Sequence, residues 1–236
     1  MSGLPPWLAI DTATDIASVA AGSAERVLAT QSIRGARQHA AQIIHLVQQV
    51  LAQAHLPLKN IAGVVVGDGP GSFTGLRIGW AAARGLAHER ELPLVAVPSL
   101  LGAAHAASAG QVATIAACYD ALRGQVFAAV YAFPQGRVET LVAPALFTMA
   151  DLTRVTPVRP LRAVGDGAEK YPQEVMTWTG HPPVSLATLP PIAGSLLTLA
   201  SAQGHEATGE PAYGRPAEAQ LKWESRHGRP LPNSSR

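Results

Sequence analysis

A four-residue motif occurs twice in this chain, and its repetition constrains the fold more than any other feature. Residues 66–69 have the sequence VGDG, and residues 164–167 repeat it. In each copy, the valine of the motif is the last residue of a short apolar run. Such a run is typical of a strand that is buried on both faces. An aspartate, Asp11 or Asp120, likewise follows the first predicted strand of each half. Because these marks fall at equivalent element ends, the sequence predicts two related α/β lobes that share a cleft.

The apolar pattern and the turn signals predict a similar order of elements in both halves, and the first half is expected to be βββαβαβα. Strands are expected there at residues 7–10, 16–21, 26–33, 61–66 and 94–97, and helices at 38–54, 74–88 and 98–107. In the second half, strands are expected at 112–118, 125–133, 137–142 and 161–164, and helices at 149–155, 168–176 and 192–203. Prolines interrupt the second half, so its lobe is predicted to be reduced. The expected parts are an N-terminal lobe (1–108), a C-terminal lobe (109–210) and a basic tail (211–236).

The composition places the chain among globular proteins and excludes several other classes. Its 236 residues are 47% hydrophobic and 14% charged, which is enough for real hydrophobic cores. No apolar run approaches the ~20 residues that span a bilayer, and the N-terminus lacks the pattern of a signal peptide. Cys118 is the only cysteine, so an intramolecular disulfide is impossible, and a buried thiol is favoured over a nucleophile. We therefore expect a cytoplasmic protein.

The charge is small, and its distribution is uneven. A net charge of +2 does not by itself indicate a nucleic-acid-binding protein. The positive excess lies in the tail, where Glu218 and Glu224 oppose five basic residues: Arg215, Lys222, Arg226, Arg229 and Arg236. A solvated tail is the simpler interpretation, and contact with RNA or an acidic partner is the alternative.

The first VGDG copy opens a glycine-rich loop between a predicted strand and a predicted helix. The loop, residues 67–72, is followed by Thr74, and either Ser72 or Thr74 could cap the helix at 74–88. A strand, a glycine loop and a helix N-terminus together suit an anion. No Gly-Lys-Ser/Thr follows, so this is not a Walker A loop. The chemistry alone favours phosphate binding and a tight turn about equally.

The helices at 38–54 and 74–88 are candidates for contact with a second protein. Apolar residues cover roughly 160° of the first helix, whereas one core face needs about 100°. Small residues recur at every fourth position of the second helix and would admit a partner helix. Two such helices could form half of a four-helix bundle, although packing within the lobe is about equally favoured. The candidate interface residues are Ile43, Leu46, Val47, Val50, Leu76, Gly79, Trp80, Ala83 and Ala87.

Two arginines lie beside this predicted interface. Arg77 and Arg84 are seven residues apart, so they lie within about 20° of each other on the helix. They could meet carboxylates of a partner or a phosphate, or they could remain solvated.

Several segments carry a resemblance to a known family. They are LAIDTAT, RQHAAQIIHLVQQVL, GDGPGSFTGLRIGWAAARGLA, YDALRGQVFAAVY and EPAYGR, which occur in this order from Leu8 to Arg215. Together they resemble the TsaB family, which takes part in the threonylcarbamoyladenosine modification of bacterial tRNA. GPGSFTGLRIG is the most specific segment. The chain departs from the family at Gly214, where the family usually has Leu between the Tyr and the Arg.

The resemblance implies a fold, partners and a role. The fold is that of actin, sugar kinases and Hsp70, with two ribonuclease-H-like lobes. The role is that of a non-catalytic partner that pairs with TsaD through the helices at 38–54 and 74–88, activates it and helps to recruit TsaE. Contact with tRNA is then indirect and no membrane is involved. Pairing of two copies through the same surface is plausible for the isolated chain.

The predicted phosphate site is a vestige of the one found in active members of this fold, with no catalytic residue and no cofactor. It comprises Asp11, Thr12, Gly69, Gly71 and Ser72. Active members carry a glycine where this chain has Ala13, and that glycine lets the backbone wrap a phosphate. We therefore favour a degraded site over the alternative, a free-standing ATP-dependent enzyme resembling a kinase.

A metal site is not expected. His39 and His45 are six residues apart, so their side chains do not share a helical face as two zinc ligands would. His88 and His105 have no partner at ligand spacing. A metallopeptidase is therefore excluded by ligand spacing.

Overall fold

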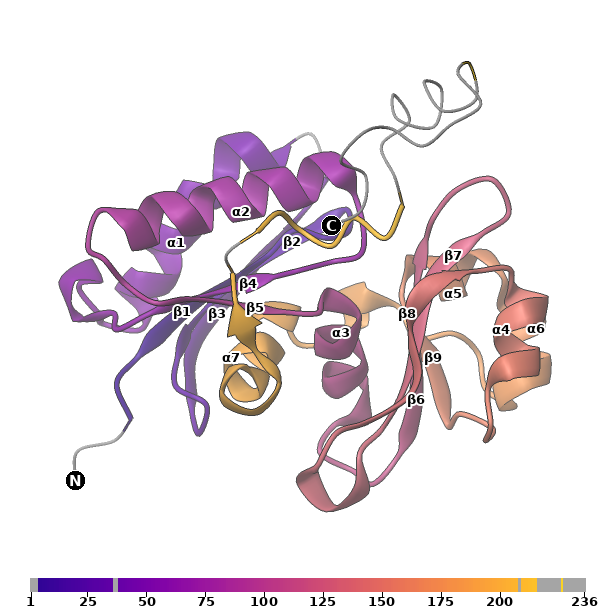
Figure 1. The fold of residues 1–236 in the computed structure, drawn as a ribbon. Coiled ribbons are helices and arrows are strands. Elements are labelled where there is room, and N and C mark those ends of the chain that lie inside the picture. Colours follow the sequence, from indigo (N-terminus) through magenta and orange to yellow (C-terminus); the bar gives the residue numbers. More distant parts are fainter. Residues whose placement is uncertain (1–3, 36–37, 208, 216–225, 227–236) are drawn as a thin grey trace.

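The computed structural model of the protein describes residues 4–35, 38–207, 209–215 and 226, and it shows two β-sheets with helices between and outside them (Figure 1). The strands are β1 (Trp7–Asp11), β2 (Ile16–Gly22), β3 (Val27–Arg34), β4 (Val64–Gly67), β5 (Leu94–Val97), β6 (Thr114–Asp120), β7 (Val126–Ala132), β8 (Glu139–Phe147), β9 (Arg162–Val164) and β10 (His205–Glu206). The α-helices are α1 (His39–Gln53), α2 (Phe73–His88), α3 (Ser99–Ser108), α4 (Met149–Val155), α5 (Asp166–Lys170), α6 (Pro172–Thr179) and α7 (Ile192–Gln203). Short 3-10 helices with described bounds are η2 (Leu58–Asn60), η3 (Pro134–Gly136) and η4 (Leu186–Thr188).

The first sheet has the order β10-β5-β4-β1-β2-β3. Strands β1, β2 and β3 form an antiparallel meander, and β4 and β5 then add parallel to β1 and to each other. Helices α1 and α2 make the crossovers that parallel strands require. This is the ribonuclease-H-like arrangement. Because β1 and β4 are parallel neighbours, the loops that follow Asp11 and Gly67 leave the same edge of the sheet.

The second sheet repeats this topology in a shorter form. Its order is β8-β7-β6-β9, with an antiparallel meander of β6, β7 and β8 and with β9 parallel to β6. Beyond β9 only Val184 makes a parallel bridge. Asp120 ends β6 as Asp11 ends β1, and the second VGDG copy follows β9 as the first follows β4. The predicted pair of related α/β lobes, with the second reduced, is confirmed.

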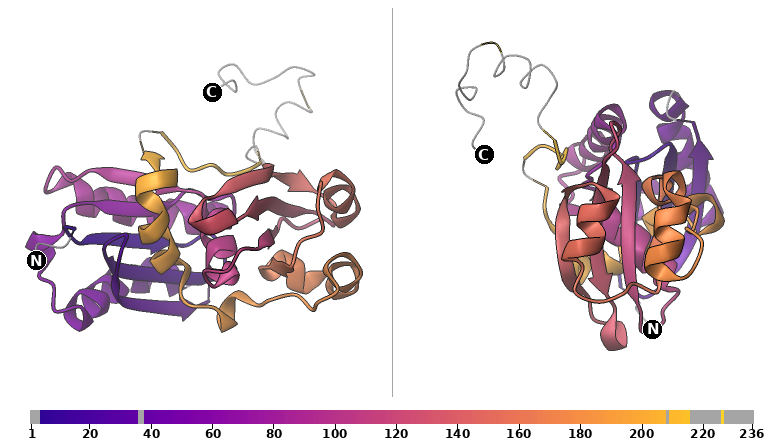
Figure 2. Two further views of the ribbon diagram at one scale, coloured as in Figure 1. Left: turned by 90° about the horizontal axis from the view of Figure 1, so that it is seen from below. Right: turned by 90° about the vertical axis from the view of Figure 1, so that its right-hand side faces the viewer.

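The layers alternate between helices and sheets. Helices α1 and α2 cover one face of the first sheet, and α7 covers the other (Figure 1). Helix α3 lies between the two sheets, in contact with α7 and with β6 and β7. Helices α4 and α6 cover the far face of the second sheet, as Figure 2 shows from two further sides. One hydrophobic cluster, which includes Leu100, Tyr119 and Leu196, therefore joins both lobes.

Most predicted elements are confirmed, and two departures have physical reasons. The helix expected at 168–176 is two helices, because Tyr171 leaves the helical region and Pro172 begins a new helix. Strand β10 was not predicted, because two residues carry no periodic pattern. The division at residue 109 stays a prediction. Helix α7 and β10 fall in its second segment but pack on the first sheet.

Two glycines provide a matched test of this layering. A Cβ on Gly102 of α3 would lie 2.7 Å from side-chain carbons of Ile192 and Leu196, whereas a Cβ on Gly85 of α2 would meet no atom within 4 Å. We expect Gly102→Val to lower the free energy of unfolding by about 1–3 kcal/mol because it overpacks the layer between the sheets. Gly85→Ala should raise it by up to about 1 kcal/mol through helix propensity. Urea denaturation measures both, and equal stabilities would contradict the packing of α3 on α7.

Candidate functional site

The loops at the edge of the first sheet bring the predicted phosphate-site residues together. The Ser72 backbone N–H donates to the Ala13 carbonyl at 2.7 Å, and Thr12 Oγ1 donates to the Gly75 carbonyl at 2.7 Å. Ser72 Oγ accepts from the Gly75 N–H at 3.2 Å and so caps α2. The Asp11 loop, the glycine loop and the N-terminus of α2 are thus one hydrogen-bonded unit.

Within this unit the glycine loop packs directly on the Asp11 loop. A Cβ placed on Gly71 would lie 2.9 Å from the Ala13 carbonyl carbon and 2.9 Å from the Ala13 Cβ. Gly71 is therefore required because the two loops touch each other, not because a ligand approaches it. Thr12 is engaged with α2, and Gly69 donates its N–H to Ser99 Oγ at 3.2 Å. The vestigial character of the site remains a prediction that this packing supports.

Asp11 is fully buried at 0% exposure and joins three segments of the chain. Its Oδ2 accepts from Ser99 Oγ on α3 at 2.5 Å, and its Oδ1 accepts from the Ala13 N–H at 3.2 Å. A Cβ on Gly67 would overlap the same carboxylate, so β4 also packs against it. Burial raises the pKa of Asp11 above 3.8, although the Ser99 and Ala13 hydrogen bonds lower it part of the way. The carboxylate is a structural crosslink.

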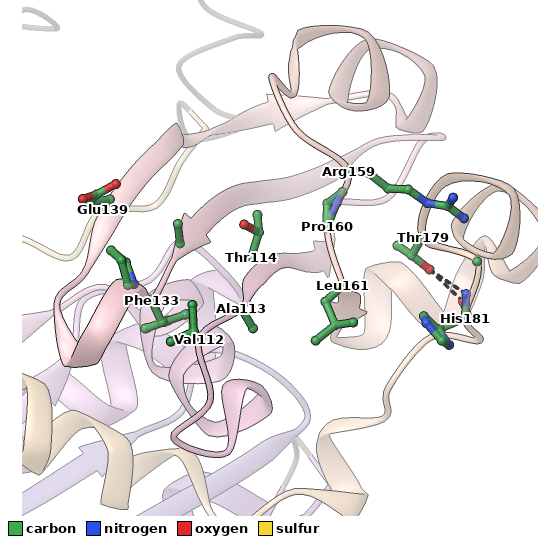
Figure 3. A pocket seen from close by; sticks show the side chains of 13 residues that line it. Val112, Ala113, Thr114, Phe133, Glu139, Arg159, Pro160, Leu161, Thr179 and His181 are labelled. Atoms are coloured by element: carbon green, nitrogen blue, oxygen red, sulfur yellow. Dashed lines mark hydrogen bonds between the residues drawn. The ribbon is translucent and has the colours of Figure 1, made fainter.

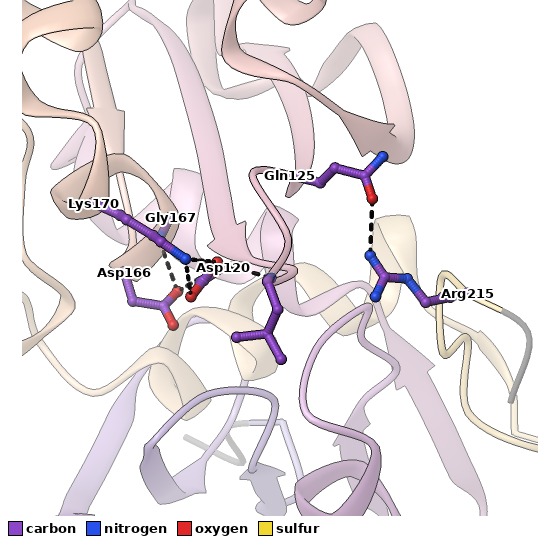
Figure 4. Close-up of polar contacts among 7 residues, drawn as sticks. Asp120, Gln125, Asp166, Gly167, Lys170 and Arg215 are labelled. Carbon is purple, nitrogen blue, oxygen red and sulfur yellow. Dashed lines mark hydrogen bonds and ion pairs between the residues drawn. The ribbon is translucent and has the colours of Figure 1, made fainter. Parts of the chain in front are cut away.

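The second lobe uses its equivalent carboxylates in a similar way (Figure 4). Both oxygens of Asp120 accept from Lys170 Nζ at 2.9 Å. Asp166 Oδ1 accepts from the Asp120 N–H at 3.1 Å and from the Gly167 N–H at 3.0 Å. Burial raises the pKa of Asp166. Asp120 and Asp166, the aspartates of the repeat in the second lobe, thus have hydrogen-bond partners within the chain.

The apolar residues predicted for a partner interface lie in the core of the first lobe, so that prediction needs a correction. Helix α1 packs on β2 and β3 and also beside α2, and this second neighbour accounts for its wide apolar arc. On α2, Trp80 Nε1 donates to the Gly67 carbonyl at 3.2 Å, and a Cβ on Gly79 would overlap Thr12 Oγ1. The small residues let α2 approach its own sheet. The buried residues are Ile43, Leu46, Val47, Val50, Leu76, Gly79, Trp80, Ala83 and Ala87.

The two predicted interface arginines bind the chain's own C-terminal segment. Arg77 Nε donates to Tyr213 Oη at 3.0 Å, and its guanidinium carbon lies 4.1 Å from the centre of the Phe73 ring. Arg84 Nη2 donates to the Gly209 carbonyl. Periodicity could not find these contacts, because Arg77 and Tyr213 are far apart in the sequence. The segment EPAYGR, which belongs to the family resemblance, was the available signal.

Both helices still present an outward face. On α1 this face includes Ile44, which is 47% exposed. On α2 it includes Ala81 and Gly85, which are exposed, and Ile78 and Ala82, which are half-buried. We call these five residues the outward face. These five side chains are small or apolar, and the exposed arginines Arg77 and Arg84 lie beside them on α2. Apolar residues together with arginine are typical of protein interfaces.

An open hollow of about 940 Å3 lies at the C-terminal end of α2, and its lining includes Arg84 and Ala87. A cavity of about 680 Å3 is lined by residues of the second lobe, including Val112, Leu161, Arg159 and His181 (Figure 3). The His181 N–H donates to Thr179 Oγ1 at 3.1 Å, so these two polar groups of the cavity wall bind each other. None of the predicted site residues lines the cavity.

The remaining candidate groups are structural. His39 is buried with Nε2 3.1 Å from the Asp15 carbonyl, and His45 Nε2 lies 3.0 Å from the side-chain amide of Gln49. Within the described residues, no group of three His, Cys, Asp or Glu side chains is placed to hold a metal ion. Cys118 is buried, and burial raises the pKa of its thiol to about 12. Among the described helices, none is long and apolar enough to cross a bilayer.

The buried carboxylate makes a prediction about pH. Because the pKa of Asp11 is raised in the folded state above 3.8, the folded protein holds a proton that the unfolded chain has lost, and stability falls as pH rises through that window. Asp11→Asn removes this dependence while keeping the shape. We expect the stability of the variant relative to the wild type to increase from about pH 4 upward in urea denaturation. Glu25→Gln, at an exposed position, is the control, and parallel curves for Asp11→Asn would contradict a raised pKa.

Comparison with known proteins gives one consistent family. The family model described as TsaD, tRNA N6-adenosine threonylcarbamoyltransferase, matches residues 27–179. The chain is 41% identical over 125 residues to the tRNA threonylcarbamoyladenosine biosynthesis protein TsaB of Escherichia coli, a match that covers 52% of this chain and 54% of that protein. It is 32% identical over 146 residues to TsaB of Bacillus subtilis, covering 61% of this chain and 62% of that protein. The matches thus span little more than half of these curated relatives.

Solved structures extend the likeness over whole chains. YeaZ from Pseudomonas aeruginosa is 29% identical, has a TM-score of 0.74, and is covered along 100% of its length by 89% of this chain. A second structure from that organism, titled an uncharacterized protein with similarity to peptidase YEAZ, is 29% identical with a TM-score of 0.71, covering 90% of this chain and 100% of that one. The family match over residues 27–179 shows that the chain belongs to the tRNA N6-adenosine threonylcarbamoyltransferase family, and the relatives described above make it similar to TsaB proteins.

Proposed function

We propose that the protein is a non-catalytic partner of TsaD in the cytoplasmic complex that forms threonylcarbamoyladenosine in tRNA. In this role it stabilises and activates TsaD and helps to recruit TsaE, and it meets tRNA only through the complex. The observation that supports the non-catalytic role is the close packing of the Asp11 loop, the glycine loop and the N-terminus of α2 on one another. Gly71 is packed on Ala13, and Asp11 is bound by Ser99. A group that is buried and satisfied within the chain is not available to a nucleotide or its metal ion.

The outward face is our proposed site of pairing with TsaD. Ile44, Ala81 and Gly85 are exposed on two neighbouring helices, and a Cβ on Gly85 meets no atom within 4 Å. A partner helix could therefore approach α2 closely at this point. The pairing helices proposed from the sequence are retained, and the contacting residues move from the buried face to the outward one. The same face could pair two copies of the isolated chain.

Ala81 and Ala83 on α2 allow a matched test of this face. Ala81 is exposed, and Ala83 is fully buried. We expect Ala81→Arg to change the free energy of unfolding by no more than about 0.5 kcal/mol. In size-exclusion chromatography, the same variant should fail to co-elute with TsaD. Ala83→Arg should lower the free energy of unfolding by about 3 kcal/mol or more, because it buries an unpaired charge.

The outcomes separate the two faces of the helix. An Ala81→Arg protein that melts normally and still co-elutes with TsaD would remove the outward face from the interface. Ile44→Lys on α1 is the companion variant, and it should lose TsaD in the same way if both helices contribute.

The alternative function, a free-standing enzyme of the kinase type, requires the chain to bind nucleotide alone. We expect titration calorimetry of the purified chain with Mg-ATP to give no micromolar binding, because Ala13 replaces the phosphate-loop glycine and packs against Gly71. A micromolar dissociation constant that is lost in Asp11→Asn would contradict the proposal and favour the enzyme.

Reconstitution tests the role itself. TsaD, TsaE, the enzyme that makes the carbamoyl adenylate, and tRNA are combined with and without this chain. We expect modified tRNA to accumulate only when the chain is present. Equal rates without it would overturn the proposed function.

A further inference from the structure

A segment near the end of the described chain crosses from the first lobe to the second. Residues 209–215, which we call the strap, run beside α2 toward the start of β7 (Figure 1). On the first lobe, the Ala212 N–H donates to the Asp68 carbonyl at 2.9 Å. The centres of the Tyr213 and Phe73 rings are 4.7 Å apart, and Tyr213 Oη accepts a hydrogen bond from Arg77 Nε. Backbone, ring and hydroxyl contacts thus fix the middle of the strap on the glycine loop and α2.

The end of the strap binds the second lobe. Arg215 Nη2 donates to Gln125 Oε1 at 3.1 Å, as Figure 4 shows, and its guanidinium carbon lies 5.9 Å from the centre of the Phe127 ring. Between these contacts the chain passes through a narrow gap. A Cβ on Gly214 would lie 2.6 Å from the Pro70 Cβ and 2.9 Å from an edge carbon of Phe127. The positive φ of +70° at Gly214 also favours glycine. Pro70 belongs to the first lobe and Phe127 to the second, so this glycine sits where the lobes meet.

The strap holds a hairpin with an unusual backbone. The β6–β7 turn has positive φ values at three consecutive residues: Leu122 (61°), Arg123 (53°) and Gly124 (79°). A left-handed conformation is unfavourable for leucine and arginine and persists where the surroundings impose it. On one side, Asp120 Oδ1 accepts from the Leu122 N–H at 2.9 Å. On the other side, the strap reaches the hairpin through Gln125. Leu122 is consequently presented to solvent with 63% of its surface exposed.

The contacts of the strap differ from those that otherwise join the lobes. Helix α3 connects the two sheets through a buried apolar cluster, which can act as a pivot but is not easily separated. The strap contacts are hydrogen bonds and ring contacts at the rim of that cluster: Phe73 is 42% exposed, Tyr213 is partly buried against the cluster, and Phe127 belongs to it. Contacts at such a rim can open without unfolding the core. Their opening would let the second lobe rotate about α3.

We propose that residues 209–215 are an interlobe latch, which holds the β6–β7 hairpin and the second lobe in a fixed orientation to α2 and releases them when Tyr213 and Arg215 detach. The latch also connects two surfaces. Helix α2 contains Phe73 and Arg77, which the strap contacts. It also contains Ala81 and Gly85 of the outward face. A change at either end of the strap therefore reaches the other lobe through a short chain of contacts. This inference concerns the isolated chain and does not depend on the proposed function.

Spin-label distance measurement tests the latch in the full-length protein. Nitroxide labels are attached to cysteines introduced at Gln53 on α1 and Ala145 on β8, which are both exposed positions in different lobes. Cys118 need not be replaced, because it is buried and its thiol pKa is about 12. Labelled protein is diluted with unlabelled protein so that distances between copies do not contribute. We expect a single narrow distance distribution for the unmodified strap.

Two strap glycines supply the variant and its control. Gly214→Leu forces a side chain into the gap between Pro70 and Phe127, and we expect loss of the single narrow distribution and faster amide exchange at residues 121–125. Gly209→Ala adds a methyl group where no atom lies within 4 Å, and both measurements should remain as in the wild type. A Gly214→Leu protein that folds and keeps the wild-type distance and exchange would overturn the latch.

A second variant covers the case in which Gly214→Leu does not fold. Tyr213→Ala combined with Arg215→Gln removes the contacts at both ends of the strap without adding volume. This double variant should show the same broadened distances and faster hairpin exchange, with far-ultraviolet circular dichroism unchanged. A wild-type distance distribution in the folded double variant would overturn the proposal in the same way.

Discussion

The packing of α3 between two β-sheets is the constraint on which the rest of the structure depends. Each sheet needs one face buried, and α3 with α7 supplies apolar surface to both through a single cluster. The alanines at 103, 104 and 107 allow the close approach, because larger residues would separate the layers. Once α3 is fixed, Ser99 at its start meets Asp11 at the end of β1. The geometry around Asp11 therefore depends on where α3 is placed against the first sheet.

Much of the fold could be predicted from the sequence, because the signals behind it are local. The repeated VGDG, the aspartates at 11 and 120 and the alternating apolar runs indicate two related lobes, and the structure confirms them. The functional face could not be predicted in the same way. A wide apolar arc on α1 fits both a partner and a second neighbour within the lobe, and only the placement of α2 beside α1 decides between them. The small residues on α2 are ambiguous for the same reason, since Gly79 serves contact with Thr12.

The arginines show a different limit of sequence patterns. The spacing of Arg77 and Arg84 predicts that they share one side of α2, and both side chains are exposed in the structure. Their partners, Tyr213 and the Gly209 carbonyl, come from a segment without regular secondary structure, for which periodicity has no information. Conversely, the likeness to TsaB proteins identified EPAYGR as a segment of interest without showing what it contacts. For the predicted phosphate site, the sequence offers one chemical argument, Ala13 in place of a glycine, and the vestigial character of the site stays a prediction.

The return of α7 to the first sheet has a consequence for the order in which the protein can fold during synthesis. Strands β1 to β5 of that sheet are complete once Val97 has been made, but the helix that covers its second face begins only at Ile192, and the edge strand β10 follows at His205. Until then, an apolar sheet face is exposed or only partly covered by α3. Contacts between residues so distant in sequence form slowly, and exposed sheet surfaces in the meantime are prone to association. The first lobe therefore begins the described chain but depends for its completion on a helix that is made only after the second sheet.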